Sequence, residues 1–469
     1  MLESTVAPLP HVAIQVFSET NQVVSVVEEA SHDRRMAKVH MRIQAGGVAA
    51  AVEAYRDAPT PNVIVIETVN DSHSLLSALD ELASYCDEGT RVVVIGHVND
   101  VPLYRELIRR GVSEYLVAPI SVLSFIQALS EIFSNPTAKP VGRSVAVIGA
   151  KGGIGASSIS HNLAHTIASD FQIETVIVDL DLPFGTAGLD FNQDPPQGVM
   201  EAAFDPARVD ANMIERLLSR CSPRLNLMAA PSSLDRIYDF SSETFEPVSD
   251  ALRATVPAII YDVPHMWTGW SRNVLVRADE VVVVAEPDLA NLRNAKNLID
   301  TLTLARPHDP RPRLVLNRIG MPKRPEISTP EFCKALDCTP LATLQFDAQL
   351  FGTASNNGQM IAEVQPKSKA QEAFLDLGLA ARDARGIAHQ LGHGGFADGG
   401  AASGAQQLCH QRQAKRHVVK AEGDARGQAV GSADERRCAV AKIDENVTMA
   451  GRSDFRGHQH LGGLHGRST

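Results

Sequence analysis

The residues best suited to chemistry in this sequence lie in a glycine-rich loop that carries a single lysine. The loop, AKGGIGASS at 150–158, follows the apolar run SVAVIGA and precedes the helical stretch ASSISHNLAHTIA. Such a loop points backbone N–H groups and a helix N-terminus at an anion, and glycine lets the backbone approach phosphate oxygens. The pattern predicts a site for the phosphates of a nucleotide, lined by Lys151, Gly152, Gly153, Ile154, Gly155, Ala156, Ser157 and Ser158.

The loop departs from the standard P-loop pattern at two positions. Ala150 replaces its first glycine and Ala156 replaces its lysine, so a positive charge beside the β- and γ-phosphates is missing. Lys151, at the start of the loop, could supply that charge, and Ser157 stands where a hydroxyl would hold Mg²⁺. On the loop alone, a strand-to-helix turn that binds nothing remains the alternative.

Aspartates follow two further apolar runs of the same segment. VIVDLDLPFG carries Asp179 and Asp181, and AIIYDVPH carries Asp262. Ligands of open α/β sheets collect at the carboxyl ends of the strands, where a carboxylate can hold Mg²⁺ through water or orient an attacking water. One isolated aspartate would more often cap a helix or turn. Three of them together with a phosphate loop favour a nucleotide site.

The chain divides into segments of different composition. Residues 10–135 alternate short apolar runs with helical patterns, which indicates βαβ units around a parallel sheet. Residues 144–390 repeat this alternation and predict a doubly wound sheet of about seven strands. The polar stretch at 136–143 is expected to be a linker. Residues 391–469 hold 14 of the 33 glycines and none of the 26 prolines, which predicts a disordered tail or out-of-frame sequence.

The first segment resembles a response-regulator receiver, a flavodoxin-like fold, but lacks the residues of phosphoryl transfer. A working receiver needs an aspartate at the end of its third strand, an acidic pair after the first, and a lysine before a proline after the fifth. The corresponding residues here are Glu67, the single acid Glu19, and Ala118 before Pro119. We therefore expect a docking or dimerisation module rather than a phosphorylated one.

The second segment is similar to the MinD/ParA superfamily of deviant P-loop ATPases. The resemblance rests on KGG-x-G with its leading lysine, DLDLPFGTAGLD, YDVPH followed by Trp267, and VLNR. Ala156, DVPHMW and FGTASNNGQMIAEV are similar to the CpaE/TadZ proteins of Flp (tight-adherence) pilus assembly. The resemblance covers roughly residues 1–390 and leaves the tail outside.

This resemblance implies a role for each residue of the site. Lys151 would reach the phosphates of the partner in an ATP-sandwiched dimer, and Asp181, beside Asp179, would position the attacking water. The Mg²⁺ ligands would be Ser157, Asp181 and Asp262, and Asn317 would contact adenine. The implied cofactors are ATP and Mg²⁺. With alanine at 150 and 156, we expect weak hydrolysis or none.

Net charge, cysteine content and apolar runs limit which partners and which cell compartment are expected. The net charge of −11 argues against a broad grip on nucleic acid. The six cysteines form no CxxC pair, which fits a reducing cytoplasm and disfavours a zinc site. No secretory signal and no run of about 18 apolar residues are present. The helical segment at 367–391 is mixed in charge, so direct membrane insertion is not expected.

We therefore expect an ATP-binding spatial organiser of a pilus secretion machine. It would act as a nucleotide-dependent homodimer at a cell pole or at the cytoplasmic face of the inner membrane, where it recruits machine components. A ParA-like partitioning ATPase is one alternative, although that function would need a basic surface patch and a lysine in the P-loop. A nucleotide-independent scaffold is another. The degenerate receiver disfavours a two-component output protein, and the mixed-charge helix disfavours a MinD-like membrane cycle.

Overall fold

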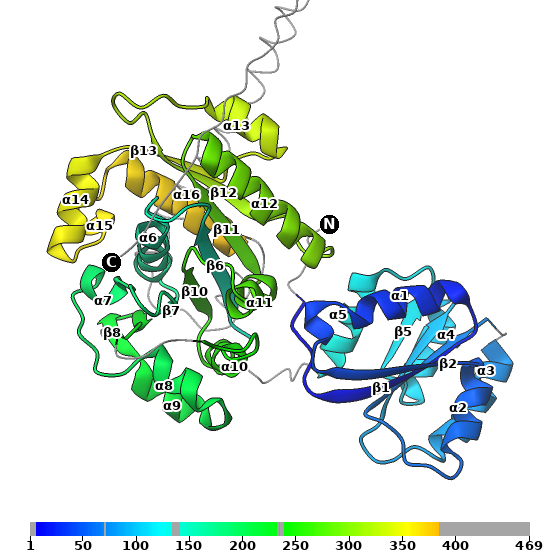
Figure 1. Cartoon of the computed structure of the whole chain (residues 1–469). Helices are drawn as coiled ribbons and strands as arrows, with labels where there is room; N and C mark the ends of the chain where they lie inside the picture. Colours follow the sequence, from blue (N-terminus) through cyan, green and yellow to red (C-terminus); the bar gives the residue numbers. More distant parts are fainter. Residues whose placement is uncertain (1–5, 70–71, 134–140, 232–233, 235–238, 384–469) are drawn as a thin grey trace, which may run out of the picture. The chain divides into compact units, whose positions relative to one another are not determined.

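The computed structural model describes residues 6–69, 72–133, 141–231, 234 and 239–383, and these contain two separate β-sheets (Figure 1). The predictions for the tail at 391–469 and for most of the linker at 136–143 concern residues outside the described part. Both sheets carry helices on both faces, which confirms the predicted α/β class with a receiver-like domain followed by a doubly wound P-loop domain. The exact domain limits remain a prediction.

The first sheet has five parallel strands in the order β2-β1-β3-β4-β5. Every residue of the central strand β3 is buried, as expected for a strand covered on both faces. Helices α1 and α5 cover one face, and α2, α3 and α4 cover the other. The elements are β1 (Val12–Ser18), α1 (Asn21–Ser31), a 3-10 turn η1 (Arg34–Met36), β2 (Val39–Ala45), α2 (Gly47–Tyr55), β3 (Val63–Thr68), α3 (Ser72–Ala83), β4 (Arg91–Gly96), α4 (Val101–Arg109), β5 (Glu114–Val117) and α5 (Val122–Phe133).

The second sheet has eight strands in the order β13-β12-β11-β6-β10-β7-β9-β8. Seven are parallel, and the edge strand β8 pairs antiparallel with β9. The sequence predicts about seven strands, and β8 is the addition, because its residues SRCS carry no apolar run. The strands are β6 (Arg143–Gly149), β7 (Thr175–Asp179), β8 (Ser219–Ser222), β9 (Leu225–Met228), β10 (Ala258–Val263), β11 (Glu280–Ala285), β12 (Arg313–Ile319) and β13 (Ala342–Gln345).

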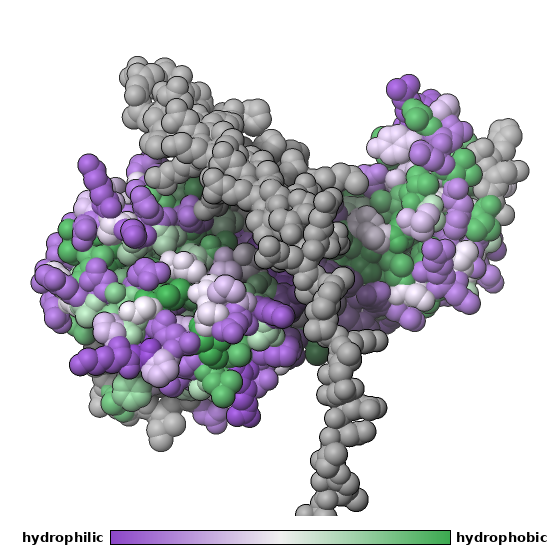
Figure 2. Space-filling model, turned by 90° about the horizontal axis from the view of Figure 1, so that it is seen from above, coloured by the Kyte–Doolittle hydropathy of each residue, from purple (hydrophilic) through white to green (hydrophobic). Residues whose placement is uncertain are grey.

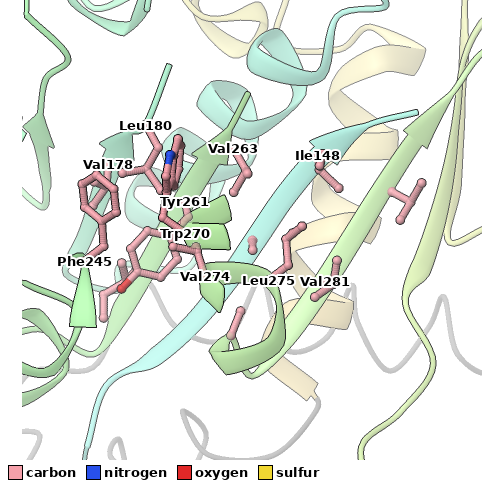
Figure 3. Close-up of a cluster of buried hydrophobic side chains, with 14 of the residues drawn as sticks. Ile148, Val178, Leu180, Phe245, Tyr261, Val263, Trp270, Val274, Leu275 and Val281 are labelled. Carbon is pink, nitrogen blue, oxygen red and sulfur yellow. The ribbon is translucent and has the colours of Figure 1, made fainter. Parts of the chain in front are cut away.

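Each face of this sheet is buried under its own set of helices. One core contains residues from α8 to α13, and the other contains residues from α6, α7 and α14 to α16. Figure 3 shows part of the first core, where Trp270 packs against Phe245 with ring centroids 5.1 Å apart. The helices are α6 (Ala156–Ser169), α7 (Ala187–Asp190), α8 (Val199–Phe204), η2 (Pro206–Arg208), α9 (Ala211–Leu217), α10 (Glu246–Thr255), α11 (Gly269–Arg277), α12 (Leu289–Ala305), α13 (Thr329–Leu336), α14 (Ala348–Asn357), α15 (Ile361–Val364) and α16 (Lys369–Asp383).

The topology brings three loops to one sheet edge. Strand β6 lies between β10 and β11, while the chain leaves β6 toward α6 on one face and leaves β10 toward α11 on the other. Such a change of face is a topological switch point, where open α/β sheets bind ligands. The loops after β6, β7 and β10 therefore meet at the edge that carries the predicted site.

The surface carries scattered apolar side chains. Figure 2 shows one face, on which hydrophobic residues lie among hydrophilic ones. Large apolar side chains that stay exposed include Phe184, Met266 and Trp267. Among the described helices, none combines the length and the apolar character needed to cross a bilayer.

Candidate nucleotide-binding site

The phosphate loop has a backbone that only glycine adopts without strain at two positions. Gly153 and Gly155 have φ angles of +76° and +86°, in the left-handed region. Gly155 caps α6 without any side-chain hydrogen bond, so the first N–H groups of this fourteen-residue helix are left for a ligand. A Cβ atom on Gly155 would also lie 2.8 Å from Nδ2 of Asn317. The local structure is thus that of an anion-binding loop.

Burial separates the residues that anchor the loop from those that could contact a ligand. Ala150 and Ile154 are buried in the core, whereas Lys151, Gly152 and Gly153 are exposed. The backbone N–H of Ala150 donates to Val284 O at 2.8 Å, so this departure from the P-loop pattern leaves the strand pairing intact.

Three side chains from other elements hold carbonyl groups of the loop. His265 Nδ1 donates to Gly149 O at 2.8 Å, Asn294 Nδ2 to Ala150 O at 2.9 Å, and Asn317 Nδ2 to Ile154 O at 2.7 Å. With its carbonyls occupied in this way, the loop can turn its N–H groups toward a ligand. Sequence reasoning missed His265 and Asn294, since single polar residues after a strand or within a helix give no distinctive signal. The contact of Asn317 with adenine remains a prediction.

The two strand-end aspartates lie side by side. Asp262 pairs in register with Asp179 on the neighbouring strand, and both are buried. Asp179 accepts backbone hydrogen bonds from Asp181 at 3.0 Å and Ala187 at 3.1 Å, so it fixes the turn after β7. Burial, followed by the charge of Asp262, raises the pKa of Asp179 to about 7. Asp179 is therefore better suited to holding this turn than to binding a metal.

Asp181 lies in the turn between β7 and α7. Its carboxylate accepts a hydrogen bond from the backbone N–H of Phe184 at 3.3 Å. Burial raises the pKa of Asp181 above its usual range. The carboxylate is half-buried, and the side chain of Phe184 beside it is 72% exposed. This turn therefore presents an apolar side chain next to the predicted water-positioning group.

A buried histidine lies between two acidic side chains of the site. His161, on α6, has no exposed surface; its Nδ1 donates to Asp190 at 2.7 Å, and its Nε2 lies 3.4 Å from Asp262 Oδ2. Burial alone would lower the pKa of this imidazole, but hydrogen bonds and charges from Asp190 and Asp262 raise it to about 10. His161 thus supplies a fixed positive charge within an acidic cluster. Sequence reasoning missed His161, because it lies within an otherwise apolar helical pattern.

The residues present fit Mg²⁺ bound together with a nucleotide. Mg²⁺ is usually held by one or two protein oxygens plus substrate phosphates and water. Ser157 in the first turn of α6 and Asp262 at the end of β10 can provide those oxygens. Within the described part of the chain, no three His, Cys, Asp or Glu side chains are grouped as a metal site of their own.

A cavity of about 360 Å³ adjoins the start of α6. This volume is within the range of small-molecule pockets. The wall combines the backbone of the loop with apolar and polar side chains from the ends of β12 and β13 and from α14. Its residues are Gly155, Ser158, Asn317, Arg318, Met321, Gln345, Phe346, Asp347, Ala348, Phe351, Gly352 and Ser355. A base and ribose would be accommodated here, next to the phosphate loop.

In the first domain, both oxygens of the Glu67 carboxylate already accept hydrogen bonds. Glu67 is fully buried and accepts hydrogen bonds from Ser18, from the backbone of Glu19, from the backbone and hydroxyl of Thr20, and from His97. Burial alone would raise the pKa of Glu67, but these hydrogen bonds lower it below its usual range. The carboxylate is therefore a fixed anion that holds the turn after β1.

Parts of the chain are similar to known proteins. No protein-family model matches the chain. It is 41% identical to the pilus assembly protein CpaE from Caulobacter crescentus CB15, over 28% of this chain and 98% of that one, with a TM-score of 0.27. It is 26% identical to the septum site-determining protein MinD of Bacillus subtilis, over 50% of this chain and 88% of the relative. A ParA family ATPase from Chlorobium tepidum TLS is 24% identical, covering 51% of this chain and 98% of that one, with a TM-score of 0.45.

The match to CpaE covers 98% of the compared chain and 28% of this one, and the match to MinD covers 88% of that relative and 50% of this chain. The sequence motifs KGG-x-G, DLDLPFG and DVPHMW lie in the site described above. The chain therefore belongs to the CpaE pilus assembly proteins, within the MinD/ParA superfamily of ATPases.

Proposed function

We propose that this chain binds Mg-ATP and acts as a nucleotide-dependent dimer that organises the assembly of an Flp-type (type IVb, tight-adherence) pilus secretion machine. The main observation in support is that three features of the site lie together at one edge of the sheet. The free N–H groups of the phosphate loop, Asp262 and the 360 Å³ cavity all lie at the start of α6 or beside it. Family membership supports the pilus role.

Slow hydrolysis or none is part of the proposal. The lysine of the standard loop is replaced by Ala156, which packs against the core. The carboxylate of Asp181, expected to position water, accepts a hydrogen bond from its own turn. Either feature would weaken stabilisation of the charge that develops during phosphoryl transfer. The chain would therefore work through the bound state rather than through rapid turnover.

A homodimer is the expected functional form, because Lys151 is exposed at the start of the loop. An exposed lysine at the mouth of the loop can contribute a charge to phosphates held by a second subunit. We expect partners among machine components at the cytoplasmic face of the inner membrane. A DNA-partitioning role is the weaker proposal, because the net charge is −11.

Calorimetric titration of the full chain with Mg-ATP and with Mg-ADP tests nucleotide binding, with phosphate release and molar mass measured on the same sample. We expect saturable binding of both nucleotides and slow release of phosphate. The molar mass should double with Mg-ATP and stay unchanged with Mg-ADP. Binding without any change in mass would retain the site and reject the dimer. Absence of heat and of thermal stabilisation at millimolar ATP would make the chain a nucleotide-independent scaffold.

A further inference from the structure

Two cysteines meet where helix α13 ends. Asp337 has the left-handed conformation, with φ +49°, and its N–H donates to Lys334 O at 3.3 Å. The N–H of the next residue, Cys338, donates to Cys333 O at 3.1 Å. These two hydrogen bonds define a Schellman motif, in which the side chains at the two ends of the longer turn frequently contact each other. The residues at those ends are Cys333 and Cys338, so the backbone places two thiols side by side.

The two thiols contact each other and remain within reach of solvent. Both side chains pack against the same hydrophobic core, and both are partly exposed free cysteines. The thiol of Cys338 donates a hydrogen bond to the sulfur of Cys333. Among the described residues, no three His, Cys, Asp or Glu side chains form a possible metal site. The pair is therefore better suited to oxidation than to metal binding.

We infer that Cys333 and Cys338 form a reversible disulfide by exchange with a low-molecular-weight disulfide such as oxidised glutathione. The thiolate of Cys333 attacks one sulfur of the reagent, and the first glutathione leaves as a thiolate. The thiolate of Cys338 then attacks Cys333 Sγ in this mixed disulfide, and the second glutathione leaves. Two electrons pass from the cysteines to the reagent, and the two departing thiolates take up the two protons. This inference is independent of nucleotide binding.

The end of the helix holds the pair ready for this exchange. Arg311 Nη1 donates to Asp337 O at 3.2 Å, which fixes the turn from outside the helix. Two groups on a short flexible linker meet at an effective concentration in the millimolar range, and the native pair should exceed that value by about tenfold or more. Burial raises the pKa of both thiols above the usual range, so the exchange is expected to be slow at neutral pH.

The test is equilibration of the reduced full chain with mixtures of oxidised and reduced glutathione, followed by blocking of free thiols, intact mass and tryptic mapping. Trypsin cuts after Lys334, so the disulfide joins two separate peptides and is identified directly. We expect a link between Cys333 and Cys338 without retained glutathione. In Cys333→Ser and in Cys338→Ser, the remaining cysteine should keep one glutathione instead. Glutathione retained on both cysteines of the wild type, or links from them to other cysteines alone, would overturn the disulfide.

Variants of Asp337 test whether the helix end sets the pairing. Glycine adopts the left-handed conformation freely, so Asp337→Gly should retain the high effective concentration. A β-branched residue is strained there, so Asp337→Val should lower it toward the value of the chain unfolded in urea. Equal effective concentrations in the native and the urea-unfolded wild type would show that the fold does not prepare the pair. Equal values in the two Asp337 variants would overturn the role of the Schellman motif.

Discussion

His161 and Asp262 form a fully buried ion pair between the helix that follows the phosphate loop and the strand end that faces it, with Nε2 and Oδ2 3.4 Å apart. Asp190 accepts from the other ring nitrogen, so one imidazolium bridges two carboxylates. Burying a charge is costly unless it is paired. The positive charge of His161 therefore offsets the cost of burying the neighbouring carboxylates.

Replacing His161 with phenylalanine is expected to destabilise the nucleotide-binding domain by about 3–5 kcal/mol, because the carboxylates of Asp262 and Asp190 lose their counter-charge. His165 lies on the same helix and, among the described residues, has a 3.4 Å contact with Ser169 in place of an ion pair, so His165→Phe serves as the control and should cost much less. Urea unfolding followed by Trp270 fluorescence measures both. Equal stability of the two variants would show that the pair contributes nothing.

The same pair predicts a pH dependence of stability. The folded pKa of His161, about 10, lies above the value near 6.5 of an unfolded histidine, so the folded state binds the proton more tightly. The contribution is complete below about pH 6.5 and is lost as the pH rises through about 10. The stability gap between the wild type and His161→Phe should therefore be wide at pH 6 and narrow at pH 10. A gap that widens toward high pH would contradict this assignment.

Glu67 is predicted not to accept a phosphoryl group. Both of its oxygens already accept hydrogen bonds, and Ala118 stands where a receiver has its lysine. Incubation of the full chain with acetyl phosphate and Mg²⁺, followed by intact mass, should show no added phosphate. A stable adduct on the first domain would overturn the view of this domain as a docking or dimerisation module.

Removal of residues 392–469 is predicted to leave folding and ATP binding unchanged, because that sequence offers little apolar surface to bury. The truncation keeps α16, whose Phe374 and Leu377 belong to the core. Thermal unfolding and calorimetry of the truncated and full chains provide the comparison. A marked fall in unfolding temperature on truncation would show that the tail packs on the remainder.

A further variant restores the lysine of the standard P-loop at position 156. In Ala156→Lys, an ammonium group near the start of α6 should tighten ATP binding or raise the rate of phosphate release, through charge-assisted hydrogen bonds. Ala156→Met, of similar length without the charge, controls for size. A gain shared equally by both variants would mean that packing rather than charge is responsible.

The sequence predicts those parts of the site that depend on local order. The loop glycines and the aspartates at 179 and 262 follow apolar strands, and parallel topology then brings them to one edge. His161, His265 and Asn294 were not predictable, because their partners stand 29 to 144 residues away and are chosen by packing. The same holds for the cavity, which joins residues 155 and 355. Periodicity identifies elements, whereas contacts between them require the folded chain.

We propose that Lys151 provides the phosphate-binding charge in place of the lysine lost at Ala156, and calorimetry of ATP binding to the wild type and to Lys151→Ala tests this role. A charge-assisted hydrogen bond to phosphate contributes about 1.5–3 kcal/mol. We therefore predict that ATP affinity falls about ten- to a hundredfold and that the ATP-dependent increase in molar mass disappears. Unchanged affinity and unchanged mass in Lys151→Ala would contradict this role of Lys151 and leave the loop as a vestigial turn.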